Sequence, residues 1–121
     1  MTESLTANQA LIIKLTEIVL TNLGNKNFDV REFARESGIS RSALNRKLRQ
    51  ILNKNINQFI REVRLQKAFE MLKNGSVTAS EVAYKVGFTS PAYFNACFHE
   101  FFGFPPGKVK SRYSENQDEN F

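Results

Sequence analysis

The same helix-turn-helix pattern occurs twice in this chain, and this internal repeat restricts the possible folds. Residues 33–40 (FARESGIS) correspond to residues 82–90 (VAYKVGFTS). Gly38 of the first copy recurs 49 residues later as Gly87, and the positions after the glycine recur 50 residues later. Each copy has apolar residues at helical spacing on both sides of a turn that contains glycine. The repeat predicts an all-α fold with two helix-turn-helix units.

The charge of the chain is positive and unevenly distributed. The 121 residues include 17 Lys and Arg against 12 Asp and Glu, which gives a net charge of +5 and a pI near 9.6. Between residues 41 and 67, Glu62 is the only acid among eight bases: Arg41, Arg46, Lys47, Arg49, Lys54, Arg61, Arg64 and Lys67. A basic segment of this kind is typical of a surface that binds phosphates. An ordinary solvated basic surface is the alternative.

Seven helices are predicted from the apolar spacing and from start and stop signals. They cover residues 9–23, 29–37, 40–52, 56–73, 78–86, 90–102 and 105–113. Most of the 11 phenylalanines fall on apolar helix faces, which indicates core positions. The predicted organisation is a disordered segment 1–8, a first subdomain 9–54, a linker helix 55–74, a second subdomain 75–113 and a disordered acidic tail 114–121.

Two capping boxes are predicted at corresponding points of the two repeats. Asp29 precedes Glu32 by three residues, and Thr78 precedes Glu81 by three residues. In a capping box each of the two side chains accepts a hydrogen bond from the backbone N–H of the other residue. Their recurrence supports a helix start at the same point of both units.

The second helix of the first unit has a polar stripe suited to reading DNA bases. Arginine can form a bidentate contact with guanine, and asparagine can do so with adenine. The candidate base contacts are Arg41, Ser42, Asn45, Arg46 and Arg49. The candidate phosphate contacts near them are Ser40, Lys47 and Lys54. The alternative is a solvated polar face without a ligand.

The matching stripe of the second unit is less polar. Its candidate base contacts are Pro91, Ala92, Asn95, Ala96 and His99, and Ser90 is a candidate phosphate contact. We expect this helix to make fewer base contacts and to depend more on DNA shape and phosphates. His99 is the only histidine and cannot form a metal site alone. Cys97 is the only cysteine, lies beside the core stripe and is expected to be a packed thiol.

Other classes of function find no support in the residues. The chain lacks a glycine-rich phosphate loop, a metalloprotease HExxH motif and a hydrolase GxSxG motif. We therefore predict no enzymatic activity, no cofactor and no metal. No apolar run approaches the roughly 18 residues of a membrane span, and the N-terminus does not resemble a signal peptide. The expected location is the cytoplasm.

From Leu15 to Tyr113 the sequence resembles the DNA-binding domain of the AraC/XylS family of bacterial transcription regulators. The stretches that carry the resemblance are residues 39–48, 59–68, 81–94 and 98–106. The resemblance implies two helix-turn-helix units joined by one long helix, with both recognition helices in successive major-groove segments of double-stranded DNA. It implies base contacts at Ser42, Asn45, Arg46, Pro91, Ala92, Asn95 and Ala96. The family often has Arg or Lys where this chain has Ala96.

The resemblance also implies partners beyond DNA. Family members usually join this domain to a ligand-binding or signalling domain, so an upstream signalling domain and RNA polymerase are expected partners. Overall similarity suggests the output domain of a hybrid two-component sensor-regulator. Two alternatives stay open: a protein-interaction module that retains the fold with weak or nonspecific DNA binding, and a nonspecific DNA-packaging protein. The modest net charge disfavours the latter.

Overall fold

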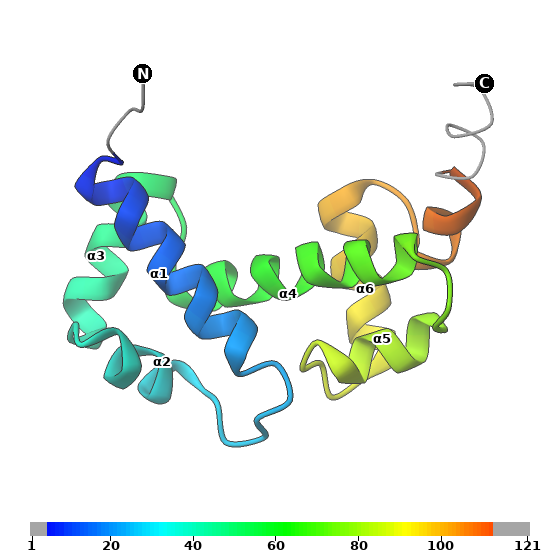
Figure 1. The fold of residues 1–121 in the computed structure, drawn as a ribbon, viewed down its shortest axis with the longest axis horizontal. Coiled ribbons are helices and arrows are strands. Elements are labelled where there is room, and N and C mark those ends of the chain that lie inside the picture. The colour runs from blue at the N-terminus through cyan, green and yellow to red at the C-terminus, as the bar shows by residue number, and fades with distance from the viewer. Residues whose placement is uncertain (1–4, 113–121) are drawn as a thin grey trace. The chain divides into compact units, whose positions relative to one another are not determined.

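In the computed structural model, which describes residues 5–112, the chain is helical and contains no strand within that range (Figure 1). Six α-helices and one 3-10 helix confirm the predicted all-α fold with seven helices. Residues 109–112 continue in helical conformation after the 3-10 helix. The elements are α1 (Ala7–Thr21), α2 (Val30–Ser37), α3 (Arg41–Leu52), α4 (Ile56–Lys73), α5 (Ala79–Lys85), α6 (Pro91–Phe102) and η1 (Pro106–Lys108).

The chain forms two structural units, and the division falls inside α4. The first unit is Met1–Val63 and the second is Arg64–Phe121. The 18-residue helix α4 is continuous across this point. Each half of α4 contributes side chains to the core of one unit. The linker role of residues 55–74 stays a prediction.

The core of the first unit is built from α1, α2, α3 and the first half of α4. The Phe33 ring lies at its centre, fully buried, with the Phe28 ring edge-on at 6.1 Å and the Phe59 ring stacked at 6.0 Å between centroids. Around these rings lie Leu15, Val19, Leu44, Leu48, Ile56 and Ile60. Burial of these apolar faces fixes α3 against α2 and turns the polar side of α3 toward solvent.

The second unit has its own core, formed by the rest of α4 with α5, α6 and the segment after η1. Phe69 of α4 contacts two rings of α6, with centroids 6.4 Å from Phe98 and 4.8 Å from Phe102. The buried residues are Leu65, Ala68, Leu72, Val82, Ala83, Val86, Phe88, Phe94, Phe98, Pro106 and Val109. The prediction that most phenylalanines pack in the core is confirmed within the described residues.

The first helix begins earlier than predicted, at Ala7 instead of residue 9. The Thr6 hydroxyl accepts the Gln9 N–H at 3.1 Å, and the Gln9 side chain accepts the Thr6 N–H at 2.9 Å. This capping box stabilises a helix start inside the segment 1–8 that was predicted to be disordered. The helix also ends two residues early, at Thr21. Residues 1–4 and the predicted acidic tail 114–121 lie outside the described residues.

The two predicted capping boxes have different outcomes. The box of Thr78 and Glu81 is confirmed in both directions. The other is only half formed: Asp29 accepts the Glu32 N–H at 2.9 Å, but the Glu32 carboxylate instead accepts a hydrogen bond from the Arg35 guanidinium. This hydrogen bond and the positive charge of Arg35 lower the pKa of Glu32. A cationic neighbour on the same helix face thus outcompetes the backbone N–H for the carboxylate.

Candidate nucleic-acid interface

The turn between α2 and α3 is fixed by backbone and side-chain hydrogen bonds. Gly38 adopts a left-handed conformation (φ 75°), and its N–H donates to the Ala34 carbonyl at 3.1 Å. The Ser40 hydroxyl then accepts the Ala43 N–H at 3.3 Å and begins α3. From α1, the Lys14 ammonium donates to the Ser37 carbonyl at 2.9 Å, a contact that the sequence pattern did not predict. These bonds set the direction in which α3 leaves α2.

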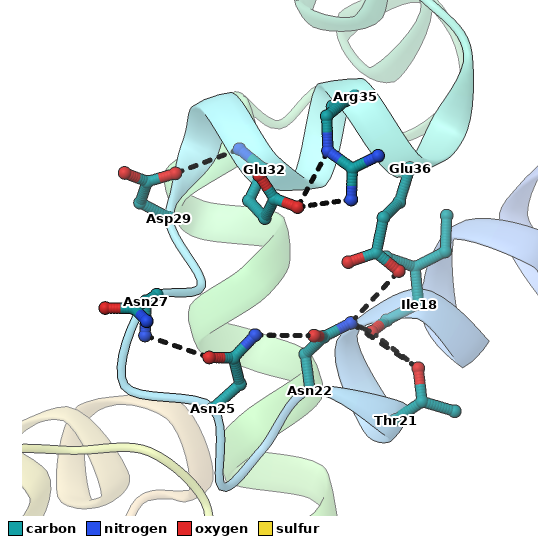
Figure 2. Close-up of polar contacts among 9 residues, drawn as sticks. All are labelled: Ile18, Thr21, Asn22, Asn25, Asn27, Asp29, Glu32, Arg35 and Glu36. Atoms are coloured by element: carbon teal, nitrogen blue, oxygen red, sulfur yellow. Dashed lines mark hydrogen bonds and ion pairs between the residues drawn. The ribbon is translucent and has the colours of Figure 1, made fainter.

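An asparagine network connects the C-terminal end of α1 to the last turn of α2 (Figure 2). Asn22 is 8% exposed, and its amide nitrogen donates to the Ile18 carbonyl at 2.7 Å and to the Glu36 carboxylate at 3.3 Å. The Asn25 side chain donates to the Asn22 oxygen at 3.1 Å and accepts the Asn27 N–H at 3.0 Å. The network satisfies a buried amide and holds α2, the first helix of the helix-turn-helix, against α1.

The polar side of α3 is exposed and positively charged. Five of the predicted DNA contacts are exposed on this helix: Arg41, Ser42, Arg46, Lys47 and Arg49. Four of these residues are cations, namely Arg41, Arg46, Lys47 and Arg49, and no acidic side chain within residues 5–112 forms an ion pair with any of them. Their charges are therefore uncompensated locally, which is the condition for attracting a polyanion.

Asn45 differs from the rest of the predicted stripe because the structure gives it a structural contact. Its side chain is half-buried, and its amide oxygen accepts the Ile56 N–H at 3.0 Å. Asn55 accepts the Gln58 N–H at 2.8 Å. The two asparagines together cap the N-terminus of α4. A bidentate contact with adenine would use the same Asn45 oxygen, so base reading and capping compete for one acceptor.

Lys54 and Arg64 are partly withdrawn from solvent. The Lys54 ammonium, a predicted phosphate contact, lies 2.5 Å from the Glu62 carboxylate, and both side chains are largely covered. Burial lowers the pKa of the Arg64 guanidinium. Its Nε has no hydrogen-bond partner within the described residues. Fewer of the eight bases in residues 41–67 are therefore available to a ligand than the sequence indicated.

The second helix-turn-helix has the same local construction with different surface chemistry. The Ser90 hydroxyl accepts the Tyr93 N–H at 3.2 Å, and Pro91 occupies the first position of α6. Of the predicted contacts, Ala92, Asn95, Ala96 and His99 are exposed, whereas Ser90 and Pro91 are half-buried. Helix α6 carries neither Lys nor Arg. Sequence reasoning missed two exposed aromatic residues beside this turn, Tyr84 and Tyr93.

The remaining candidate residue is Cys97. Cys97 is a half-buried free thiol. Within residues 5–112 no three His, Cys, Asp or Glu side chains are grouped so that they could hold a metal ion. In the same range, no helix has the length and apolar character needed to cross a membrane.

Comparison with known protein families gives a consistent result. A family described as "Helix-turn-helix domain" matches residues 33–112. A curated relative, histidine kinase P4 of Formosa agariphila, is 39% identical over 89% of this chain. The matched stretch is 8% of that kinase, and the chain spans 41% of the Msm operon regulatory protein of Streptococcus mutans.

Solved structures share the fold. A transcriptional regulator with an AraC-type DNA-binding domain from Chromobacterium violaceum superposes with a TM-score of 0.78 at 21% identity, covering 87% of this chain and 93% of its own. The DNA-binding domain of AdpA, solved in complex with a target DNA, has a TM-score of 0.71 at 25% identity and covers 87% of this chain and 96% of its own.

Proposed function

Because this chain belongs to the AraC-type family of helix-turn-helix domains, we propose that it binds double-stranded DNA in a sequence-specific manner and regulates transcription in bacteria. In this proposal α3 enters the major groove. Arg41, Arg46 and Arg49 contact bases, Ser42 supports them, and Lys47 contacts the backbone. The observation that carries the proposal is the uncompensated cationic face of α3 next to the turn built around Gly38.

The second unit is proposed to bind the next major-groove segment of the same duplex. Helix-turn-helix dimers place two recognition helices about 34 Å apart, one turn of DNA. Here α4 joins two units within one chain, and its 18 residues span about 27 Å at 1.5 Å per residue. If the recognition helices of the two units are not one DNA turn apart, the DNA would have to bend to contact both, at a cost of a few kcal/mol.

The chain is proposed to act as the output part of a larger signalling protein in the cytoplasm. It is similar to a small segment of a protein named as a histidine kinase, and one solved neighbour is named as the C-terminal domain of a response regulator from Geobacillus stearothermophilus. A signalling domain would then control DNA binding, and RNA polymerase would be the downstream partner.

The proposal is tested by selecting binding sites from a random DNA pool and measuring affinity by gel shift with random-sequence competitor. We expect a defined motif. Arg46→Ala should weaken binding to the selected site by about 1–3 kcal/mol and relax preference at one base pair. An equal loss on selected and random duplexes would show that Arg46 does not read a base.

A second candidate function is a protein-interaction module with weak or nonspecific DNA binding. The observation that favours it is the absence of Lys and Arg from α6. If competitor DNA abolished binding at every salt concentration and selection returned no motif, this second function would replace the first.

A further inference from the structure

The internal repeat allows α3 and α6 to be compared position by position. Helix α6 lacks the positive charges that α3 carries. The three arginines of the α3 face correspond to uncharged or weakly basic residues 50 positions later. Arg41 corresponds to Pro91, Arg46 to Ala96 and Arg49 to His99. If the second unit binds DNA, as the proposed function requires, its affinity must come mainly from groups other than cations on α6.

Two tyrosines of the second unit are exposed to an extent unusual for large aromatic side chains. Tyr84 is 57% exposed and Tyr93 is 55% exposed, whereas Phe101, the most exposed phenylalanine among the described residues, is at 37%. Neither tyrosine hydroxyl has a hydrogen-bond partner within residues 5–112. Each phenol thus presents a free donor to solvent while its ring remains next to the protein surface.

The two tyrosines lie on either side of the second turn. Tyr84 is in the last turn of α5, and Tyr93 is in the first turn of α6. The Tyr93 ring lies 5.9 Å from the buried Phe88 ring, which limits the motion of its side chain. In helix-turn-helix proteins the first helix crosses the DNA backbone and the N-terminal residues of the second approach the groove. Both hydroxyls are therefore on the segments that come nearest to phosphates.

The corresponding positions of the first unit strengthen this interpretation. Tyr93 corresponds to Ala43, a small residue, so the phenol is an addition in the unit that lacks arginines. Next to Tyr84, Lys85 is exposed and corresponds to the acidic Glu36. Tyr84 itself corresponds to Arg35, so the cation beside the turn moves by one residue and none is added. The second unit has thus lost cations on the reading helix and gained two hydroxyl donors beside its turn.

We propose that the hydroxyls of Tyr84 and Tyr93 donate hydrogen bonds to backbone phosphates of the DNA, so that the second unit anchors the duplex without reading much of its sequence. Tyrosine hydroxyls are established donors to phosphate oxygens, and such contacts fix register without carrying sequence information. The proposal rests on the proposed function and specifies how the second unit contributes to it.

The test uses Tyr84→Phe and Tyr93→Phe, which remove the hydroxyl and keep the ring, with Lys85→Ala as a comparator. Binding is measured by fluorescence anisotropy on the duplex obtained by site selection and on a random-sequence duplex. Each Phe variant should bind both duplexes about three- to tenfold more weakly, which corresponds to the loss of one hydrogen bond. Because tyrosine is uncharged, the dependence of log K on log salt should stay as in the wild type. Lys85→Ala should reduce that slope by about 1.

Neutral methylphosphonate groups at single backbone positions identify the contacted phosphates. At those positions the wild type and the Phe variant should bind equally. Phe variants that bind both duplexes like the wild type would overturn the proposal, as would a loss confined to the selected duplex, which would mean base reading. If the wild-type chain showed no sequence preference, the proposed function would be refuted. The affinities of the wild type and the Phe variants for the random-sequence duplex would still decide whether the tyrosine hydroxyls bind phosphates.

Discussion

The Asn45 side chain has two possible roles, capping a helix and contacting a DNA base. Its amide oxygen caps the first N–H of α4, although its position on α3 predicts contact with adenine. Its counterpart in the repeat, Asn95, is exposed on α6 and has no such bond within residues 5–112. The same residue type at matching positions therefore has a structural contact in one unit only.

We expect Asn45→Ala to lower the free energy of unfolding by about 0.5–2 kcal/mol, because the α4 N-terminus loses an acceptor. Asn45→Asp keeps the acceptor and should retain most of that stability. Asn95→Ala is the matched control and should leave the urea midpoint unchanged. Equal midpoints for Asn45→Ala and Asn95→Ala would mean that the cap contributes nothing to folding.

At the scale of elements, the turn between α2 and α3 depends on the backbone conformation of one glycine. Gly38 has a φ of +75°, and no residue other than its two chain neighbours has an atom within 4 Å of where a Cβ would be. An alanine there would meet no steric clash with other residues, so the cost is backbone strain alone. The turn then has to distort or bear that strain.

Gly38→Ala should therefore destabilise the first unit by about 1–2 kcal/mol, the cost of a left-handed conformation for a residue with a Cβ. Gly24→Ala is the control, because Gly24 also has free space around its Cβ position and lacks a positive φ. Thermal unfolding followed by circular dichroism measures both. A Gly38→Ala midpoint that equals that of Gly24→Ala would contradict the role given to the left-handed turn.

At the scale of the whole molecule, the distribution of unpaired cations determines the electrostatic part of DNA affinity. Lys47 is exposed without an acidic partner among the described residues, whereas Lys54 is paired with Glu62. Each phosphate neutralised by a free cation contributes about 0.9 to the slope of log K against log salt. The two lysines are close in sequence but should differ in this measurement.

Lys47→Ala should reduce the salt slope by about 1 and weaken binding on all sequences alike. Lys54→Ala should reduce it by less, because its charge is already balanced by the Glu62 carboxylate. Affinity measured over a series of salt concentrations on a random-sequence duplex separates the two variants. A larger effect at Lys54 would mean that its ion pair opens when DNA binds.

The sequence alone determined much of this fold because its signals are local. Apolar spacing and stop signals predicted α4 at Ile56–Lys73, and glycine at two equivalent points predicted the turns. The capping box of Thr78 and Glu81 was also predictable, since its partners are three residues apart. Thr6 and Gln9 have the same three-residue spacing, so the start of α1 at Ala7 was equally predictable, although the sequence interpretation began this helix at residue 9.

The tertiary structure decided what each polar side chain is free to do. Asn45 contacts Ile56, Lys14 contacts Ser37, and Lys54 pairs with Glu62, and each of these contacts joins residues eight or more positions apart. Periodicity assigns a residue to the polar side of its own helix but carries no information about which group of another segment will face it. The sequence therefore determined the helices and the charged segment, and only packing determined which cations and amides remain available to DNA.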